Sequence, residues 1–272
     1  MPDDLSDHLP DGLPVASVRK PVRLRAVPAV TRSIAILRLL GEKRAGLGVK
    51  AIADELGLVP STCLHILRVL VAENFVRVDP ETRRYSLGSG MVSIARSLLG
   101  DSTFASLSQP SLERIARERR ITVMGAEITP RRTILVLSVV RPDQPVRLHA
   151  DVGSEFPGLT SATGRLVAAF GGLDEARLRS LFPAIEWDNP PDLSQWLQEV
   201  AEAREQGWSV DRDRFKNGIT AYAVPVLDRA GRISHSLVAM GLTADMALLD
   251  ELALAGDMRR EAAAIARELH HA

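Results

Sequence analysis

The sequence predicts an α+β protein with two domains, and three observations support that class. The chain has 272 residues, more than one ordinary domain needs and enough for two. Its first third holds three segments with helical apolar spacing and two alternating segments around a turn, a pattern typical of a winged helix-turn-helix. The rest of the chain mixes strand and helix periodicities, which favours an antiparallel sheet with flanking helices.

Four parts are expected along the chain. Five prolines and little periodicity near the N-terminus predict a flexible arm. A helical stripe that includes Met91 and Ile94 predicts a connecting helix before Gly100. The expected boundaries are an N-terminal arm at 1–28, a winged helix-turn-helix domain at 29–88, a connecting helix at 89–100 and a second domain at 101–272.

Two short helices open the first domain. The first ends near Gly41, and its predicted core side consists of Val30, Ile34, Leu37 and Leu40. The second ends at Gly57, and its predicted core side consists of Val49, Ile52, Ala53 and Leu56. Because Ala53 is small and Gly57 tolerates a positive φ, we expect the chain to turn sharply here into a third helix.

The third helix has two unlike sides. Pro60 suits its first turn, where the missing N–H would be unpaired in any case, and the helix runs to about Asn74. Its predicted inward side is Cys63, Ile66, Leu67, Leu70 and Val71. Its predicted outward side is Ser61, Thr62, His65, Arg68 and Val69. A recognition helix needs such a polar side, because it offers hydrogen bonds to base edges and phosphates in the major groove.

A β-hairpin follows the third helix. Segments 75–78 and 83–87 alternate around a turn at 79–82 that contains Pro80. The tip places Arg83 and Arg84 where they can hold the DNA backbone or enter a minor groove. The predicted DNA-binding residues are Ser61, Thr62, His65, Arg68, Arg83 and Arg84. The alternative is that the three helices form an interaction module that never contacts DNA.

The charge distribution supports the same interpretation. The net charge of the chain is zero, yet residues 19–99 carry 14 basic and six acidic side chains. Residues 1–18 carry four aspartates, and residues 100–272 are also slightly acidic. A basic first domain on an otherwise acidic chain is expected where that domain meets a polyanion such as DNA. Chance clustering of solvated charges is the competing explanation.

Strands and helices alternate irregularly in the second domain. The predicted helices are 104–119, 161–170, 174–181, 192–206 and 244–269. The predicted strands are 121–128, 133–141, 145–150, 217–227 and 232–241, and the last two pair across a turn at 228–231. An antiparallel sheet covered by helices follows from this order.

Several of these segments together resemble the IclR family of bacterial transcriptional regulators. In the first domain the resemblance rests on Thr31–Leu37, Ile52–Leu58, Ser61–Thr62 and Asp79–Gly88. In the second domain it rests on Ser161–Arg165, Gly207–Asp211, Asn217–Ile219 and Ala223–Val226. It therefore covers roughly residues 28–270. This chain departs from the family at Leu64 and His65, where the family more often has a polar or aromatic residue followed by Arg. The operator sequence of a relative therefore cannot be transferred to this protein.

The resemblance implies a GAF-like second domain that binds an effector and tunes operator binding. It implies homodimers or dimers of dimers, an inverted-repeat operator, and control of the catabolism of organic or aromatic acids. The effector would contact the start of helix 161–170, whose free N–H groups and dipole suit a carboxylate. The residues expected there are Ser161, Ala162, Thr163, Gly164, Asp211, Ala221, Val238 and Met240.

The character of that pocket follows from its side chains. Ala221, Val238 and Met240 stand where relatives carry Cys or Ser, so we expect a mostly apolar effector with one acid or hydroxyl group. Asp211 either accepts a hydrogen bond from an effector hydroxyl or caps the end of a strand. The residues 161–164 either bind an acid group or only cap their own helix.

Other classes of protein are less consistent with the sequence. We find no Gly-rich phosphate loop and no His-Glu-x-x-His, and Cys63 is the one cysteine, on an inward helix side. Hence no catalytic residue, metal or cofactor is expected. No apolar run is long enough for a membrane span and no secretory signal is visible, so we expect a cytoplasmic protein. An enzyme or a non-DNA-binding oligomeric adaptor on the same α+β domain are the alternatives.

Overall fold

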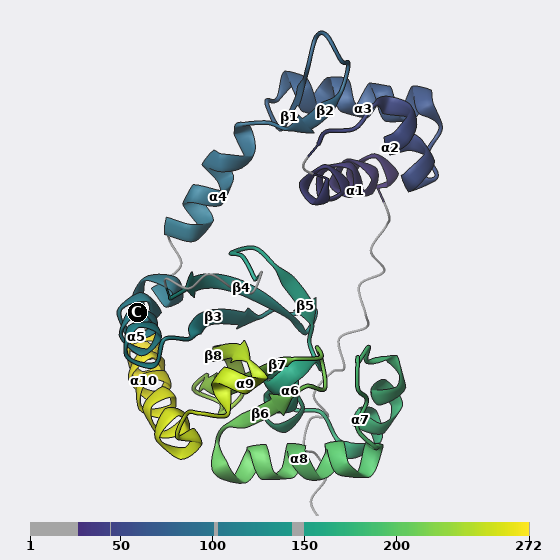
Figure 1. The fold of residues 1–272 in the computed structure, drawn as a ribbon. Coiled ribbons are helices and arrows are strands. Elements are labelled where there is room, and N and C mark those ends of the chain that lie inside the picture. The colour runs from purple at the N-terminus through teal and green to yellow at the C-terminus, as the bar shows by residue number, and fades with distance from the viewer. Residues whose placement is uncertain (1–26, 44, 101–102, 143–149, 272) are drawn as a thin grey trace, which may run out of the picture. The chain divides into compact units, whose positions relative to one another are not determined.

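The computed structural model describes residues 27–43, 45–100, 103–142 and 150–271 (Figure 1). The expected arm at 1–28 and the expected strand at 145–150 therefore lie almost entirely outside the described residues. Contacts divide the chain into two compact units, and the boundary along the chain falls between Ile94 and Ala95. No single helix among these residues is long and apolar enough to span a bilayer, although the bent pair Val49–Leu56 and Pro60–Ala72 would together meet the criteria of length and composition.

The first unit has the predicted three helices and hairpin. Its elements are α1 (Pro28–Glu42), α2 (Val49–Leu56), α3 (Pro60–Ala72), β1 (Val76–Val78), β2 (Tyr85–Leu87) and the start of α4 (Gly90–Gly100). The axes of α2 and α3 differ by 114°. Gly57 turns the chain between them with a φ of 61°, and the N–H of Leu58 bonds back to the carbonyl of Ala53 at 2.8 Å.

The core side of α1 differs from the prediction. Val30 and Ile34 are 55% and 46% exposed, whereas Ile36, Leu39 and Leu40 are buried. Apolar residues occur on more than one side of this helix, so their spacing alone is consistent with two different core sides. Contact with α3 decides between them, because the buried stripe joins the same cluster as Cys63, Leu67 and Leu70. On α3, Ile66 and Val71 are only partly buried.

The second unit contains one six-stranded antiparallel sheet in the order β5-β4-β3-β8-β7-β6. Its strands are β3 (Thr122–Ile128), β4 (Thr133–Val140), β5 (Glu155–Pro157), β6 (Ser209–Arg212), β7 (Ile219–Leu227) and β8 (Ile233–Leu242). Its helices are α5 (Thr103–Arg119), α6 (Ser161–Phe170), α7 (Glu175–Leu181), α8 (Leu193–Gln206), α9 (Thr243–Met246) and α10 (Glu251–His271), with a 3₁₀ turn at Phe182–Ala184.

This unit differs from the sequence prediction in two edge strands and in its last helix. The prediction did not include the edge strands β5 and β6, because their three and four residues are too few to show a period in the sequence. The last predicted helix is divided into α9 and α10. The second of these starts anew because the side chain of Asp250 accepts the N–H of Ala253 at 3.0 Å, which is helix N-capping.

The two faces of the sheet carry different helices. Alternate residues of a strand point to opposite faces. Val123 and Leu237 point to the face covered by α5 and α10, while Met124 and Val238 point to the face covered by α6. Helix α8 packs on the outer side of α6 (Figure 1). The face toward α6 is the one that bears a cavity.

Candidate DNA-binding helix and effector cavity

The outward side of α3 is polar and accessible. Ser61, His65 and Arg68 are exposed, and Thr62 is half-buried. The opposite side is anchored by Cys63, whose burial raises the pKa of its thiol and leaves it an unreactive core group. No side chain caps the N-terminus of α3, so its first N–H groups and the positive end of its dipole remain open to an anion.

The hairpin tip is more rigid than the sequence indicates. Asp79 accepts the N–H groups of Glu81 and Thr82, both at 2.9 Å, and these bonds lower the pKa of its carboxyl. Arg84 donates to the carbonyl of Gly46 at 3.1 Å, so part of its hydrogen-bonding capacity is used inside the unit. Arg83 is exposed, with a φ of 55°, and it has no ion pair among the described residues.

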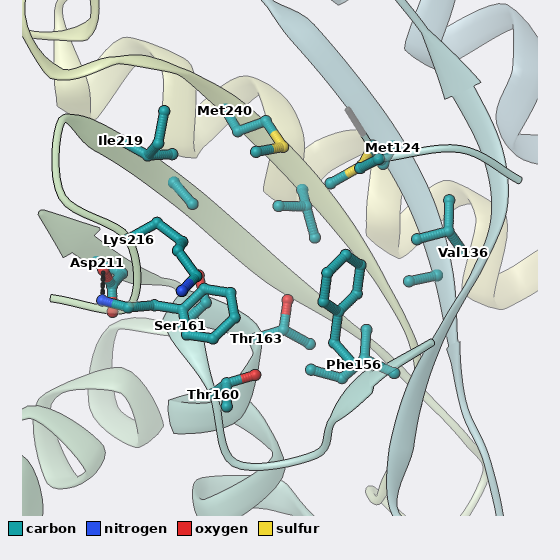
Figure 2. Close-up of a pocket in the computed structure, with 16 residues that line it drawn as sticks. Met124, Val136, Phe156, Thr160, Ser161, Thr163, Asp211, Lys216, Ile219 and Met240 are labelled. Carbon is teal, nitrogen blue, oxygen red and sulfur yellow. Dashed lines mark hydrogen bonds between the residues drawn. The ribbon is translucent and has the colours of Figure 1, made fainter. Parts of the chain in front are cut away.

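A cavity of about 330 Å³ lies between the sheet and the start of α6 (Figure 2). Its sheet wall is apolar and consists of Met124, Ala126, Ile134, Val136, Ala221, Val238 and Met240. The other wall is formed by the loops and by the first turn of α6, with Ala150, Phe156, Thr160, Ser161, Thr163, Asp211, Phe215, Lys216 and Ile219. The volume falls within the lower part of the range for small-molecule sites.

Six of the eight predicted effector residues line this cavity. The strands bring Ala221, Val238 and Met240 together because the register pairs Ala221 with Met240 and Val238 lies two residues away on the same face. The other three are Ser161, Thr163 and Asp211. Ala221, Val238 and Met240 thus supply apolar contact area, as their residue types predict.

Ala162 and Gly164 are not among the residues that line the cavity, so their contact with an effector stays a prediction. Successive helix residues differ in direction by about 100°, and these two therefore point elsewhere. The carbonyl of Ala162 accepts the hydroxyl of Ser209 at 2.7 Å. Gly164 lies against the backbone of Leu159, where an added Cβ would come within 2.1 Å of the Leu159 carbonyl carbon. Gly164 is required for close packing.

The first turn of α6 is open toward the cavity. Thr160 precedes the helix, but its hydroxyl donates to the carbonyl of Pro157 at 2.7 Å instead of capping the helix. Ser161 has a φ of 58°, an uncommon conformation for a residue other than glycine. Among the described residues, neither the N–H nor the hydroxyl of Thr163 forms a hydrogen bond with another protein group. The hydroxyl faces the cavity in Figure 2.

Asp211 is occupied by protein groups. Its Oδ2 accepts Nη1 of Arg165 at 2.9 Å, and both side chains are only 2% exposed. Its Oδ1 accepts the N–H groups of Arg214 and Phe215 at 3.2 and 3.1 Å. Capping the end of a strand, one of the two predicted roles, fits these bonds, and contact with an effector hydroxyl stays a prediction. Arg165 also donates to the carbonyl of Ser161 at 3.0 Å, which connects Asp211 to the cavity wall.

Sequence reasoning missed the two aromatic rings and the lysine of the loops. Phe156 and Phe215 both line the cavity, and their rings meet edge to face with centroids 6.4 Å apart. The Nζ of Lys216 pairs with Asp188 at 2.9 Å, and this contact holds the pKa of Asp188 below its usual range. The motif at 217–219 lies beside Lys216, but nothing in the sequence indicates that Phe156 faces the same space.

The described part of the structure contains no cluster of potential metal ligands. Within the residues that it describes, no three His, Cys, Asp or Glu side chains converge as metal ligands would. The buried polar cluster of Arg165, Asp211 and Glu199 contains an internal cation already, since Arg165 pairs with both carboxylates. Nothing at this site calls for an additional cation.

Comparison with known proteins agrees with this architecture. Residues 29–80 match the IclR helix-turn-helix domain, and residues 97–268 match the bacterial transcriptional regulator IclR C-terminal domain. A glycerol operon regulatory protein from Streptomyces griseus is 29% identical over 250 residues, covering 90% of this chain and 97% of that protein. These matches span both units.

Two solved structures show the same fold. An IclR transcriptional regulator from Alicyclobacillus acidocaldarius has a TM-score of 0.76 at 26% identity, covering 89% of this chain and 98% of that one. An IclR homolog from Microbacterium hydrocarbonoxydans, complexed with 4-hydroxybenzoate, has a TM-score of 0.74 at 18% identity, covering 90% of this chain and 100% of that one. The chain belongs to the IclR family of bacterial transcriptional regulators, with a DNA-binding helix-turn-helix domain and an effector-binding C-terminal domain.

Proposed function

We propose that the exposed side of α3 enters the major groove of the operator. Two features support this: the polar side chains lie opposite a buried apolar side, and the N-terminus of the helix is uncapped. Arg68 would hydrogen-bond a guanine edge or clamp a phosphate. Ser61, Thr62 and His65 would contact neighbouring base edges or phosphates.

The hairpin would hold the DNA backbone. Arg83 is the stronger candidate, because it is exposed and has no ion pair in the described chain. Arg84 would contribute in part through its bond to Gly46, which fixes the hairpin against the loop before α2. Contacts of this kind strengthen binding to every sequence and carry no sequence information.

We infer that the protein acts as a homodimer or as a dimer of dimers. On α1, Val30 and Ile34 are about half exposed, as is Val27 just before it, and on α4 Val92 and Ile94 are similarly exposed. Exposed apolar side chains of this kind are suited to contact a second copy. Two recognition helices then lie ~34 Å apart or at a multiple of it, so the operator would be a spaced inverted repeat.

The effector would be an organic acid with a mostly apolar body. The observation that carries this proposal is the uncapped first turn of α6, which opens into a cavity with an apolar sheet wall. The carboxylate would accept hydrogen bonds from the Thr163 N–H and hydroxyl near Ser161, assisted by the helix dipole. The apolar body would lie against Val238 and Met240, beneath Phe156.

Each part of the chain would then have the role that the sequence predicts for it. Residues 29–88 would bind DNA, 89–100 would connect, and 101–272 would bind the effector and support self-association. We propose that the protein is no enzyme, because the one carboxylate among the described lining residues, that of Asp211, is already paired with Arg165. A partner that is chromosomal DNA places it in the cytoplasm.

Calorimetric titration of the full chain tests the effector. The ligands are 4-hydroxybenzoate, benzoate and glyoxylate, which represent an aromatic acid with a hydroxyl, an aromatic acid without one, and a small polar acid. The proposal requires both aromatic acids to bind more tightly than glyoxylate, because only they bury apolar area against the sheet wall. Preferential binding of glyoxylate would reject it.

A further inference from the structure

A second cleft, of about 570 Å³, lies outside the segment that leads into α6. Three arginines surround it: Arg131 and Arg132 from the turn between β3 and β4, and Arg177 from α7. Its apolar floor includes Leu159, Leu173 and Leu181. The cleft therefore combines strong positive charge with a surface for an apolar group.

The β3–β4 turn is held firmly at this place. The N–H of Arg132 donates to the carbonyl of Thr129 at 2.7 Å, and the hydroxyls of Thr129 and Thr133 are 2.7 Å apart. Arg132 has a φ of 60°. Gly158 packs on it so closely that an added Cβ would lie 1.6 Å from the Arg132 carbonyl oxygen. The backbone that carries the two arginines is thus held against Gly158, while both side chains are exposed.

Arg177 comes from the opposite side. It lies four residues before Leu181, so both share the side of α7 that faces the cleft, while Leu178 is buried on another side. Asp174 caps this helix by accepting the backbone N–H of Arg177 at 2.7 Å. The side chain of Arg177 is exposed, and its guanidinium group has no ion pair among the described residues.

Among the described residues, no carboxylate neutralises the charge of the cleft. No carboxylate lines it, and in the described ranges none of the three guanidinium groups forms an ion pair. The effector cavity differs in this respect, because its Lys216 is paired with Asp188. Guanidinium groups match the planar or tetrahedral oxygens of carboxylates and phosphates. Three of them around one cleft suit a ligand with two negative charges.

We propose that this cleft is a second ligand site, which takes an organic dianion with an apolar body, either a phosphate monoester or a dicarboxylate. Thr160 lines both this cleft and the effector cavity, and it is 1% exposed. The segment 157–161 is therefore the wall between the two. A dianion in the cleft shifts the start of α6 and so changes the affinity for the acid in the effector cavity.

Calorimetry on the full chain tests the site without DNA and without effector. The probes are phenyl phosphate and phthalate, and whichever binds more tightly identifies the anionic group. Each binds at one per protomer, and affinity falls steeply with salt. Arg177→Gln weakens binding roughly tenfold, as does Arg131→Gln, because each removes a charge-assisted hydrogen bond. Arg117→Gln, an exposed arginine of α5 that lines neither space, leaves the affinity unchanged.

Three results would overturn the second site. One is the absence of binding by both dianions, and another is equal affinity in the Arg177→Gln and Arg117→Gln variants. The third is phenyl phosphate that binds only when 4-hydroxybenzoate is absent, since both would then occupy the effector cavity. If the arginine variants weaken phenyl phosphate while 4-hydroxybenzoate fails to bind, the second site stands and the proposed effector class fails.

Discussion

Arg165 and Asp211 connect three parts of the second unit through one buried ion pair. Arg165 donates to Asp211, to Glu199 on α8 and to the carbonyl of Ser161 at the start of α6. Asp211 in turn accepts two N–H groups of the loop that carries Phe215 and Lys216. The pair thus holds both polar sides of the cavity, and neither residue needs to touch the ligand to affect its binding.

Asp211→Ala should destabilise the second unit by about 3 kcal/mol, because it leaves Arg165 with one buried charge partner fewer. The measurement is urea unfolding followed by tryptophan fluorescence, which reports on this unit alone because Trp187, Trp196 and Trp208 are the three tryptophans of the chain. The matched control is Asp188→Ala, whose ion pair with Lys216 is exposed to solvent and therefore contributes little to stability. Equal losses in the two variants would contradict the role of the buried pair.

His235 should make the stability of the second unit depend on pH. Its ring stacks on Phe104 at a centroid distance of 4.1 Å, and burial lowers its pKa from 6.5 to about 4. Between these values the unfolded chain binds a proton that the folded chain does not. Stability therefore falls as the pH drops from about 6.5 to about 4, by up to about 3 kcal/mol.

The same unfolding assay, repeated across that pH window, checks this expectation. The matched variant is His235→Phe, which keeps an aromatic ring beside Phe104 and cannot titrate. Its stability should change much less between pH 6.5 and 4 than that of the natural chain. If both proteins lose stability with the same slope, another group is responsible.

The residues of the cavity were predictable to the extent that a motif or a residue type marked them. Ser161 and Thr163 belong to a recognisable motif at a helix start, and Val238 and Met240 alternate along a long strand. Phe156 lies on a three-residue strand, and only tertiary folding brings it to Phe215. Ala162 and Gly164 belong to the same motif but do not line the cavity, because the motif does not show which way each residue points.

At the scale of single elements, α3 is defined by contrast between its two sides. Cys63, Leu67 and Leu70 are buried, and the polar residues between them are exposed, as the period of the sequence predicts. The same method failed on α1, where apolar residues surround the helix and packing against α3 selects the core side. A strong polar side, and not the apolar stripe alone, makes the orientation of a helix predictable.

Arg68→Ala should weaken operator binding by roughly 1–3 kcal/mol, because a bidentate base contact contributes about that much. The measurement is a titration of labelled operator DNA, recovered first by selection from genomic fragments. Arg117→Ala, on α5 of the second unit, serves as the control for a lost surface arginine. An Arg68→Ala variant that binds as tightly as the control would remove this residue from the interface.

Arg83→Ala should lower affinity for operator and for unrelated DNA alike. The reason is that a phosphate contact is independent of sequence, so the slope of log affinity against log salt should decrease by about 1. Arg84→Ala should have a smaller effect on that slope, since Arg84 is engaged with Gly46. A loss of preference for the operator without a change in slope would show that the hairpin contacts bases.

For the whole molecule, the structure separates the two tasks of a regulator between two units. One unit presents a polar helix and a cationic hairpin, and the other contains a cavity with one polar end and a basic cleft behind it. The order of these parts was visible in the sequence, because strong motifs occur in both halves. The cleft was not, because Arg131, Arg132 and Arg177 come from distant segments and belong to no motif.

We expect an acid bound at the start of α6 to change the affinity of the first unit for its operator. The most direct measurement is operator titration by the full chain at increasing 4-hydroxybenzoate, for the natural chain and for Thr163→Val. The ligand should change the operator affinity of the natural chain. Thr163→Val should need roughly tenfold more ligand for the half-maximal change, because one hydrogen bond to the carboxylate is lost. Equal ligand requirements in the two proteins would show that the acid does not act through Thr163.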